Sequence, residues 1–249
     1  MIDWDACLAG TPPVRLAGTL LRLVESQEQV ATHQLVRSLE RQALLEEMLD
    51  ATKPALRRGS GSLHYLLATP FRYPPLKHGS RFGRRSEPSL GYGSLQTAAV
   101  LAEAAYYRFV FWHGMSRPPA GKLDTQHTLF GAAYRSEQGL QLQASPFEAY
   151  RAELASPSDY HASQALGTAM RAAGIEAFEF VSARDPADGI NVALFTPGAF
   201  ARKAPVSQDA WLCELTGGHV RFHAARGREL HEFSLAVFQV NGTLPWPAC

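Results

Sequence analysis

The sequence has few cysteines, no long apolar run and no excess of either charge. Its three cysteines, Cys7, Cys213 and Cys249, are far apart and form no CxxC pair, which argues against a disulfide framework and a structural zinc site. No stretch approaches the roughly 18 consecutive apolar residues that suggest a membrane-spanning helix. With 24 basic and 23 acidic residues, no net field attracts the chain to nucleic acid or to a membrane surface. These absences predict a cytoplasmic protein that binds neither nucleic acid nor membrane directly.

Several short catalytic motifs are also missing. The sequence contains no GxxxxGK[ST] phosphate-binding loop, no GxGxxG after a strand, no HExxH and no GxSxG. Asp124 and His127, in the stretch DTQH, are a closely spaced Asp/His pair. This pair forms either a small metal site or a polar turn, and the turn is the better explanation. No metal is therefore expected.

The pattern of apolar residues predicts helices and strands in mixed order, without a regular βαβ alternation, which indicates an α+β protein. The expected helices cover residues 34–52, 94–111 and 157–174. The expected strands cover residues 63–71, 176–182, 191–197, 211–215, 219–224 and 230–240. The loop RRGSGS at 57–62 is the expected boundary between a helical N-terminal extension, residues 1–60, and the main domain, residues 61–249.

Glu103 is an isolated charge on a helix that is otherwise apolar. Between Glu87 and Arg108 no other side chain is charged, and Arg108 lies five residues further on, outside the i,i+3 and i,i+4 positions that form ion pairs on a helix. A carboxylate in such surroundings either faces water or meets polar groups in a functional site. The residues alone leave both explanations open.

Residues 77–94, KHGSRFGRRSEPSLGYGS, form a basic segment rich in glycine. Gly79 and Gly83 allow the backbone around Arg81 to approach a ligand closely, and a guanidinium can bind phosphate or carboxylate with two parallel hydrogen bonds. From the residues alone, a solvated loop arginine is the favoured explanation of Arg81. Tyr92, between two glycines, either contacts a ligand with its ring or hydroxyl, or packs on the core from a turn.

Ser182 ends an apolar strand and precedes the turn-rich stretch ARDPADG. Its hydroxyl is expected at the open end of a sheet, where functional sites are often built, although an ordinary strand-ending serine has the same pattern. His78 has no assigned role, and Arg84 and Arg85 are expected at the surface.

Four stretches together resemble the RES-domain family, which is named for an arginine, a glutamate and a serine. They are ATPFRYPPLKHGSRFG (68–83), YGSLQTAAVLAEAAYYR (92–108), PSDYHASQALGTAMRAAGIEAFEFVSARDP (157–186) and NVALFTPGAF (191–200). The likeness runs from about residue 20 to about residue 240, and several long motifs in the same order make it more specific than any short pattern. By position, the three signature residues fall on Arg81, Glu103 and Ser182, and a family tyrosine falls on Tyr92.

This resemblance implies a toxin of a bacterial toxin–antitoxin pair that breaks the nicotinamide–ribose bond of NAD⁺. Family members transfer the ADP-ribose to water, to phosphate or, in some cases, to a protein. The implied fold is similar to the ADP-ribosyltransferase core, with small mixed β-sheets around an NAD⁺ cleft and flanking helices. The implied partner is a cognate antitoxin with a helix-turn-helix DNA-binding region, in a larger complex that can contain a toxin homodimer. NAD⁺ is the substrate, and no other cofactor is implied.

The resemblance also implies a role for each site residue. Arg81 would hold the pyrophosphate, and Tyr92 would pack on the nicotinamide or its ribose. Glu103 would contact the ribose hydroxyls and stabilise the positive charge that develops at the anomeric carbon. Ser182 would hydrogen-bond the ligand near the phosphates or the nicotinamide. NAD⁺ glycohydrolase or phosphorylase is the leading hypothesis, and the alternatives are an ADP-ribosyltransferase acting on a cellular protein and a non-enzymatic binding module.

Overall fold

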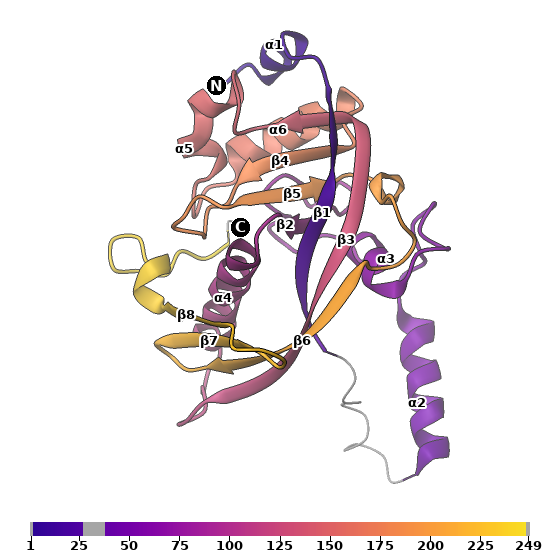
Figure 1. The fold of residues 1–249 in the computed structure, drawn as a ribbon, viewed down its shortest axis with the longest axis vertical. Helices are drawn as coiled ribbons and strands as arrows, with labels where there is room; N and C mark the ends of the chain where they lie inside the picture. The colour runs from indigo at the N-terminus through magenta and orange to yellow at the C-terminus, as the bar shows by residue number, and fades with distance from the viewer. Residues whose placement is uncertain (1, 27–37, 248–249) are drawn as a thin grey trace.

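The computed structural model describes residues 2–26 and 38–247, which form helices around one mixed sheet (Figure 1). The helices are α1 (Trp4–Ala9), α2 (Leu39–Thr52), α3 (Tyr65–Arg72), α4 (Thr97–His113), α5 (Arg151–Leu154) and α6 (His161–Ala172). The strands are β1 (Val14–Glu25), β2 (Gly91–Ser94), β3 (Leu123–Gln141), β4 (Ala177–Val181), β5 (Ile190–Leu194), β6 (Ser207–Leu215), β7 (His219–Ala224) and β8 (Leu230–Ser234). This composition confirms the predicted α+β class, and α4, α6 and β4 to β8 fall on predicted elements.

The eight strands form one hydrogen-bonded network in the order β1-β2-β5-β4-β3-β6-β7-β8. Within the described residues, β3 and β4 are the one parallel pair. β1 also pairs with β3 along most of its length, so that β1, β2, β5, β4 and β3 close into a ring. On its other edge, β3 pairs with β6 over residues 123–131 and with β4 over residues 139–141. The small sheets of the prediction are thus joined through the long strands β1 and β3 (Figure 1).

The helix α4 lies against β7 and β8 (Figure 1), and most of its apolar side chains are buried. Tyr106 and Phe109 have no exposed surface, and they belong to one apolar cluster with Trp211 of β6 and Phe222 of β7. The Tyr106 hydroxyl donates to the Pro245 carbonyl at 2.6 Å, so that its burial leaves no unsatisfied polar group. This packing fixes the rotation of α4 and therefore the direction in which its remaining side projects. No helix in the described ranges is both long and apolar enough to span a bilayer.

The first 60 residues are not a purely helical extension, and that part of the prediction is wrong. Residues 14–25 form β1, which closes the ring. Only Leu16 and Leu20 of this strand are fully buried, and Gly18 lies under the Tyr134 ring, so the strand lacks the regular alternation that would have revealed it. α2 confirms the predicted helix from residue 39 onward, whereas residues 34–37 lie outside the described residues. The proposed division at residue 60 stays a prediction.

The stretch predicted as a buried strand at residues 63–71 is instead the helix α3. The backbone N–H of Leu66 donates to His64 Nδ1 at 3.4 Å, which caps the start of the helix. Leu67 and Phe71, four residues apart, are both buried on its inner side. A short apolar run does not by itself distinguish a strand from a helix, and here the helical period is the correct one.

The polar turn predicted at DTQH is also wrong, because this stretch lies inside β3. Asp124 is exposed and His127 is buried, as expected for side chains on opposite faces of a strand, so the pair cannot share a metal ion. Asp124 instead forms an ion pair with Lys122. Arg108 of α4 donates to His127 Nε2 at 2.7 Å, and it also pairs with Glu25 at 2.8 Å. This polar group ties α4 to the sheet.

Acid is expected to destabilise the protein partly through His127. Burial, and then the nearby Arg108 charge, lower the pKa of His127 from 6.5 to about 4. Between these two pH values the unfolded chain binds more protons, so the free energy of unfolding is expected to fall as the pH is lowered through this window. Replacing His127 with glutamine, which can still accept from Arg108, should make the fall shallower. Urea unfolding at several pH values measures the difference, and an identical pH dependence in both proteins would contradict this assignment.

Candidate functional site

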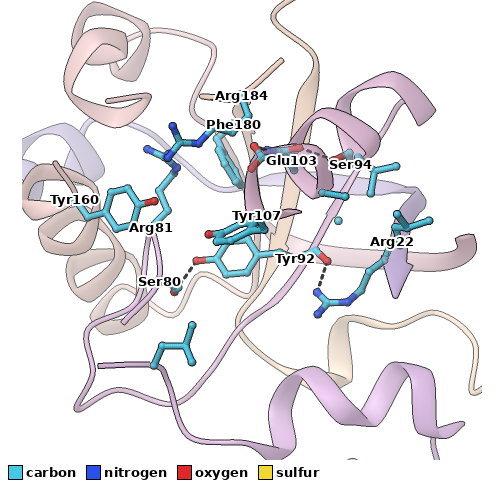
Figure 2. A pocket seen from close by; sticks show the side chains of 16 residues that line it. Arg22, Ser80, Arg81, Tyr92, Ser94, Glu103, Tyr107, Tyr160, Phe180 and Arg184 are labelled. Atoms are coloured by element: carbon cyan, nitrogen blue, oxygen red, sulfur yellow. Dashed lines mark hydrogen bonds between the residues drawn. The ribbon is translucent and has the colours of Figure 1, made fainter. Parts of the chain in front are cut away.

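A cavity of about 390 Å³ opens beside α4, between β1, β2 and β5 and the segment that carries Arg81 (Figure 2). Its lining consists of Arg22, Leu23, Leu76, Ser80, Arg81, Tyr92, Gly93, Ser94, Val100, Glu103, Ala104, Tyr107, Tyr160, Phe180, Arg184 and Asn191. The volume lies within the range of about 300–1,000 Å³ that is usual for small-molecule sites. Aromatic rings, three guanidinium groups and one carboxylate share the wall. Such a lining suits an anionic ligand that also contains flat rings.

Glu103 lies on the side of α4 that faces the cavity, and polar groups meet it there. Its Oε1 accepts hydrogen bonds from Ser182 Oγ at 2.6 Å and from Asn191 Nδ2 at 2.8 Å. Arg108 points elsewhere and pairs with Glu25, as its position on the helix suggested. Of the two explanations left open by the sequence, the structure supports the second, in which the carboxylate is held inside a polar site.

Arg81 lies at the other side of the cavity, beside Tyr160 (Figure 2). Arg81 is 9% exposed, and its guanidinium carbon lies 4.7 Å from the centre of the Tyr160 ring. Nη1 donates to the backbone carbonyls of Ser156 at 2.7 Å and Leu154 at 3.3 Å. Within residues 2–26 and 38–247 no carboxylate pairs with Arg81, so its charge is available to an anion in the cavity. Arg84, three residues on, is exposed as predicted.

Tyr92 is part of β2 and does not lie in a turn. Its ring lines the cavity, and its hydroxyl contacts Ser80 Oγ at 2.9 Å and accepts from the Phe82 backbone N–H at 3.1 Å. These two residues flank Arg81, so the hydroxyl fixes the backbone on both sides of the arginine. Burial raises the pKa of Tyr92, which keeps the hydroxyl protonated.

Removing this hydroxyl should loosen the segment that carries Arg81. In a Tyr92→Phe variant the buried Phe82 N–H loses its acceptor, and the free energy of unfolding is expected to fall by about 1–3 kcal/mol. Tyr73→Phe is the matched control, since Tyr73 is 43% exposed and should lose almost nothing. Urea unfolding measures the stability of both variants. Equal stability of the two would show that the Tyr92 hydroxyl does not stabilise the segment that carries Arg81.

Ser182 lies behind Glu103 and is not one of the cavity-lining residues. It is 4% exposed at the end of β4. Its hydroxyl donates to Glu103 and accepts the backbone N–H groups of Arg184 and Asp185, both at 3.1 Å. One serine therefore orients the carboxylate and also fixes the turn that carries Arg184.

Two further arginines reach the cavity and were missed in the sequence. Arg184 lies with its guanidinium carbon 3.5 Å from the centre of the Tyr106 ring, and it donates to the Pro157 carbonyl at 2.7 Å. Arg22 belongs to β1 and donates to the Tyr92 carbonyl at 2.8 Å, and burial lowers its pKa. Arg184 lies two residues after Ser182 in a turn-rich loop, which was an available signal. Arg22 had none, because its strand was predicted as part of a helical extension.

The structure thus brings all four predicted residues, Arg81, Tyr92, Glu103 and Ser182, to one place, three on the cavity wall and one directly behind it. No curated protein matches the chain. A family model described as RES domain matches residues 55–216, which is more than half of the chain and includes all four residues. The chain therefore belongs to the RES-domain family.

Proposed function

We propose that this protein binds NAD⁺ in the cavity and cleaves its nicotinamide–ribose bond. The observation that carries the proposal is the placement of one hydrogen-bonded carboxylate, Glu103, in a cavity whose wall also contains the guanidinium of Arg81, which no carboxylate of the described residues neutralises. NAD⁺ has a matching distribution of charge, with a pyrophosphate at one point and a ribose that becomes positive during cleavage at another. Membership of the RES-domain family supports the same substrate.

Arg81 and Arg184 are the groups that would bind the pyrophosphate. Both guanidiniums line the cavity, and both are pre-oriented by backbone carbonyls and by a tyrosine ring. A group that is already fixed loses little conformational entropy when the ligand binds. The flat nicotinamide would pack among the aromatic side chains of the wall, which include Tyr92 and Tyr107.

Glu103 would act at the ribose during bond breaking. When the bond between the anomeric carbon and the nicotinamide nitrogen breaks, its electron pair moves to the ring nitrogen and nicotinamide leaves as a neutral molecule. Positive charge then develops on the ribose, and a carboxylate fixed beside it stabilises that charge without having to reorganise. Water or phosphate next bonds to the anomeric carbon, and water loses a proton in doing so. Ser182 assists through Glu103 and does not need to touch the ligand.

The experiment is to incubate purified protein with NAD⁺ and identify the products by mass. Release of nicotinamide is expected, with ADP-ribose in buffer alone for a glycohydrolase or ADP-ribose 1-phosphate in phosphate for a phosphorylase. An ADP-ribosyltransferase would instead turn over slowly alone and label a protein in lysate. Intact NAD⁺ under all three conditions would leave only a binding module and overturn the proposal.

We also propose that the protein is a toxin whose cognate antitoxin, carrying a helix-turn-helix region, covers the cavity. Leu76 and Tyr107 line the cavity and are 64% and 48% exposed, so its rim offers an apolar surface to a protein segment. Expression of the wild-type chain should arrest bacterial growth, and co-expression of the antitoxin encoded beside it should restore growth. Growth unaffected by the wild-type chain would contradict this part of the proposal.

A further inference from the structure

Two buried polar residues on neighbouring strands form a chain of hydrogen bonds that ends on Glu103. Ser94 of β2 and Asn191 of β5 are direct partners in the antiparallel pairing and are 2% and 4% exposed. Ser94 Oγ donates to Asn191 Oδ1 at 2.6 Å, and Asn191 Nδ2 donates to Glu103 Oε1 at 2.8 Å. Neither residue belongs to the arginine, glutamate and serine that give the family its name, and neither was predicted as a site residue.

The chemistry of the three side chains determines which group donates and which accepts in each of these hydrogen bonds. An ionised carboxylate only accepts hydrogen bonds, so the Asn191 side chain must turn its NH₂ group toward Glu103. The amide oxygen then faces Ser94, whose hydroxyl is able to donate to it. Without Ser94, the amide could turn over and present its oxygen to the carboxylate, which would be repulsive. The serine therefore selects the useful orientation of the amide.

Asn191 and Ser182 hold the same oxygen of Glu103 from two different strands. Both donate to Oε1, and among the described residues no group is hydrogen-bonded to Oε2. Two donors on one oxygen restrict rotation of the carboxylate and leave the second oxygen for the contents of the cavity.

We propose that Ser94 and Asn191 form a positioning pair that holds Oε1 of Glu103 and leaves its Oε2 directed at the ligand. This inference rests on the proposed function, in which Glu103 acts at the ribose. The alternative is a purely structural role, in which Ser94 and Asn191 only satisfy each other's hydrogen-bonding groups where they are buried between strands. That alternative predicts effects on stability alone, whereas the positioning role predicts effects on the rate and its pH dependence.

The test is an Asn191→Asp variant, which keeps the shape of the side chain, removes the donor and adds a charge of the same sign beside Glu103. We expect kcat for nicotinamide release to fall about 10- to 100-fold near neutral pH, with KM changed less than about 3-fold. The acidic limb of the pH–rate profile should move to higher pH, because the carboxyl now holds its proton more strongly. An unchanged limb together with an unchanged kcat would overturn the proposal.

The ionisable groups that the wild type already has near the site do not obscure this readout. They are Arg22, Arg81, Arg184, Asp185, Tyr92, Tyr106, Tyr107 and Tyr160. Arginine and tyrosine side chains ordinarily change charge only near pH 10 or above, outside the acidic limb. Asp185 accepts backbone N–H bonds from Ala187 and Gly189 and is the same in the wild type and the variant, so the comparison cancels its contribution.

A Ser94→Ala variant tests the second member of the pair. It should lower kcat about 3- to 10-fold in the wild-type background and have little further effect in an Asn191→Ala background, because the serine acts through the amide. Ser136→Ala is the matched control, since Ser136 is also buried and donates to a carboxylate, that of Glu176, at 2.8 Å. Equal losses of kcat in the Ser94 and Ser136 variants would mean that the pair is merely structural.

A failure of the proposed function can be separated from a failure of this inference. If the wild-type protein releases no nicotinamide, the proposed function fails, but the pair can still be tested in the free protein. The ¹³C resonance of the Glu103 carboxyl is then followed by NMR as the pH is varied. A midpoint at higher pH in Asn191→Asp than in the wild type supports the pair, and identical midpoints overturn it.

Discussion

A Glu103→Gln variant is expected to release nicotinamide from NAD⁺ at least about 100-fold more slowly than the wild type while folding normally. The amide oxygen of glutamine can still accept the hydrogen bonds that Ser182 and Asn191 donate, so the side chain keeps its position. The variant loses only the negative charge that would stabilise the developing cation. A matched comparison of kcat and of Tm measures the two effects separately.

The control for this result is an acidic residue outside the cavity. Glu87 accepts from Thr168 Oγ1 at 2.5 Å and from the Arg84 backbone N–H at 2.8 Å, so Glu87→Gln removes a charge in a comparable setting. It should leave nicotinamide release within about 3-fold of the wild type. Full activity in Glu103→Gln, or an equal loss in Glu87→Gln, would contradict a catalytic role for Glu103.

An Arg81→Lys variant is expected to lower kcat/KM for NAD⁺ about 10- to 100-fold, chiefly through a higher KM. Lysine keeps the positive charge, but it lacks the planar fork that can bind the Ser156 carbonyl and a phosphate at the same time. Lysine is preferable to alanine here, because removing the whole side chain would leave the Leu154 and Ser156 carbonyls without a donor and could destabilise the fold.

Arg84→Lys provides the control for this substitution, because Arg84 lies three residues away in the same segment and is exposed. Its KM should equal that of the wild type. Dissociation constants for NAD⁺, measured by calorimetry in the Glu103→Gln background, distinguish loss of binding from loss of rate. If Arg81→Lys and Arg84→Lys bind NAD⁺ equally well, the pyrophosphate is not held by Arg81.

The sequence predicted the helices and short strands that have a strong pattern of their own. α4 is rich in alanine and α6 has a clear apolar stripe, and both lie where they were expected. β1 and β3 were missed for a physical reason. Much of each strand is exposed or half-buried, and their stability comes from pairing with each other over more than 100 intervening residues, which no local pattern records.

The sequence also predicted only part of the candidate site. Arg81, Tyr92, Glu103 and Ser182 were found because they lie in motifs that resemble the RES-domain family, and the structure brings them together. Asn191 was missed although it lies in one of those motifs, since a lone asparagine in an apolar strand signals nothing until Ser94 is known to be its partner across the sheet. Contacts between strands, and not residue types, reveal this part of the site.

In the proposed function, this cavity holds NAD⁺ with its nicotinamide–ribose bond beside Glu103. The most direct measurement is a crystal structure of the Glu103→Gln variant soaked with NAD⁺, in which slow turnover preserves the ligand. We expect the pyrophosphate to contact Arg81 and the anomeric carbon to lie next to the side chain at position 103. Intact NAD⁺ bound elsewhere, or bound with its nicotinamide–ribose bond far from position 103, would contradict the claim.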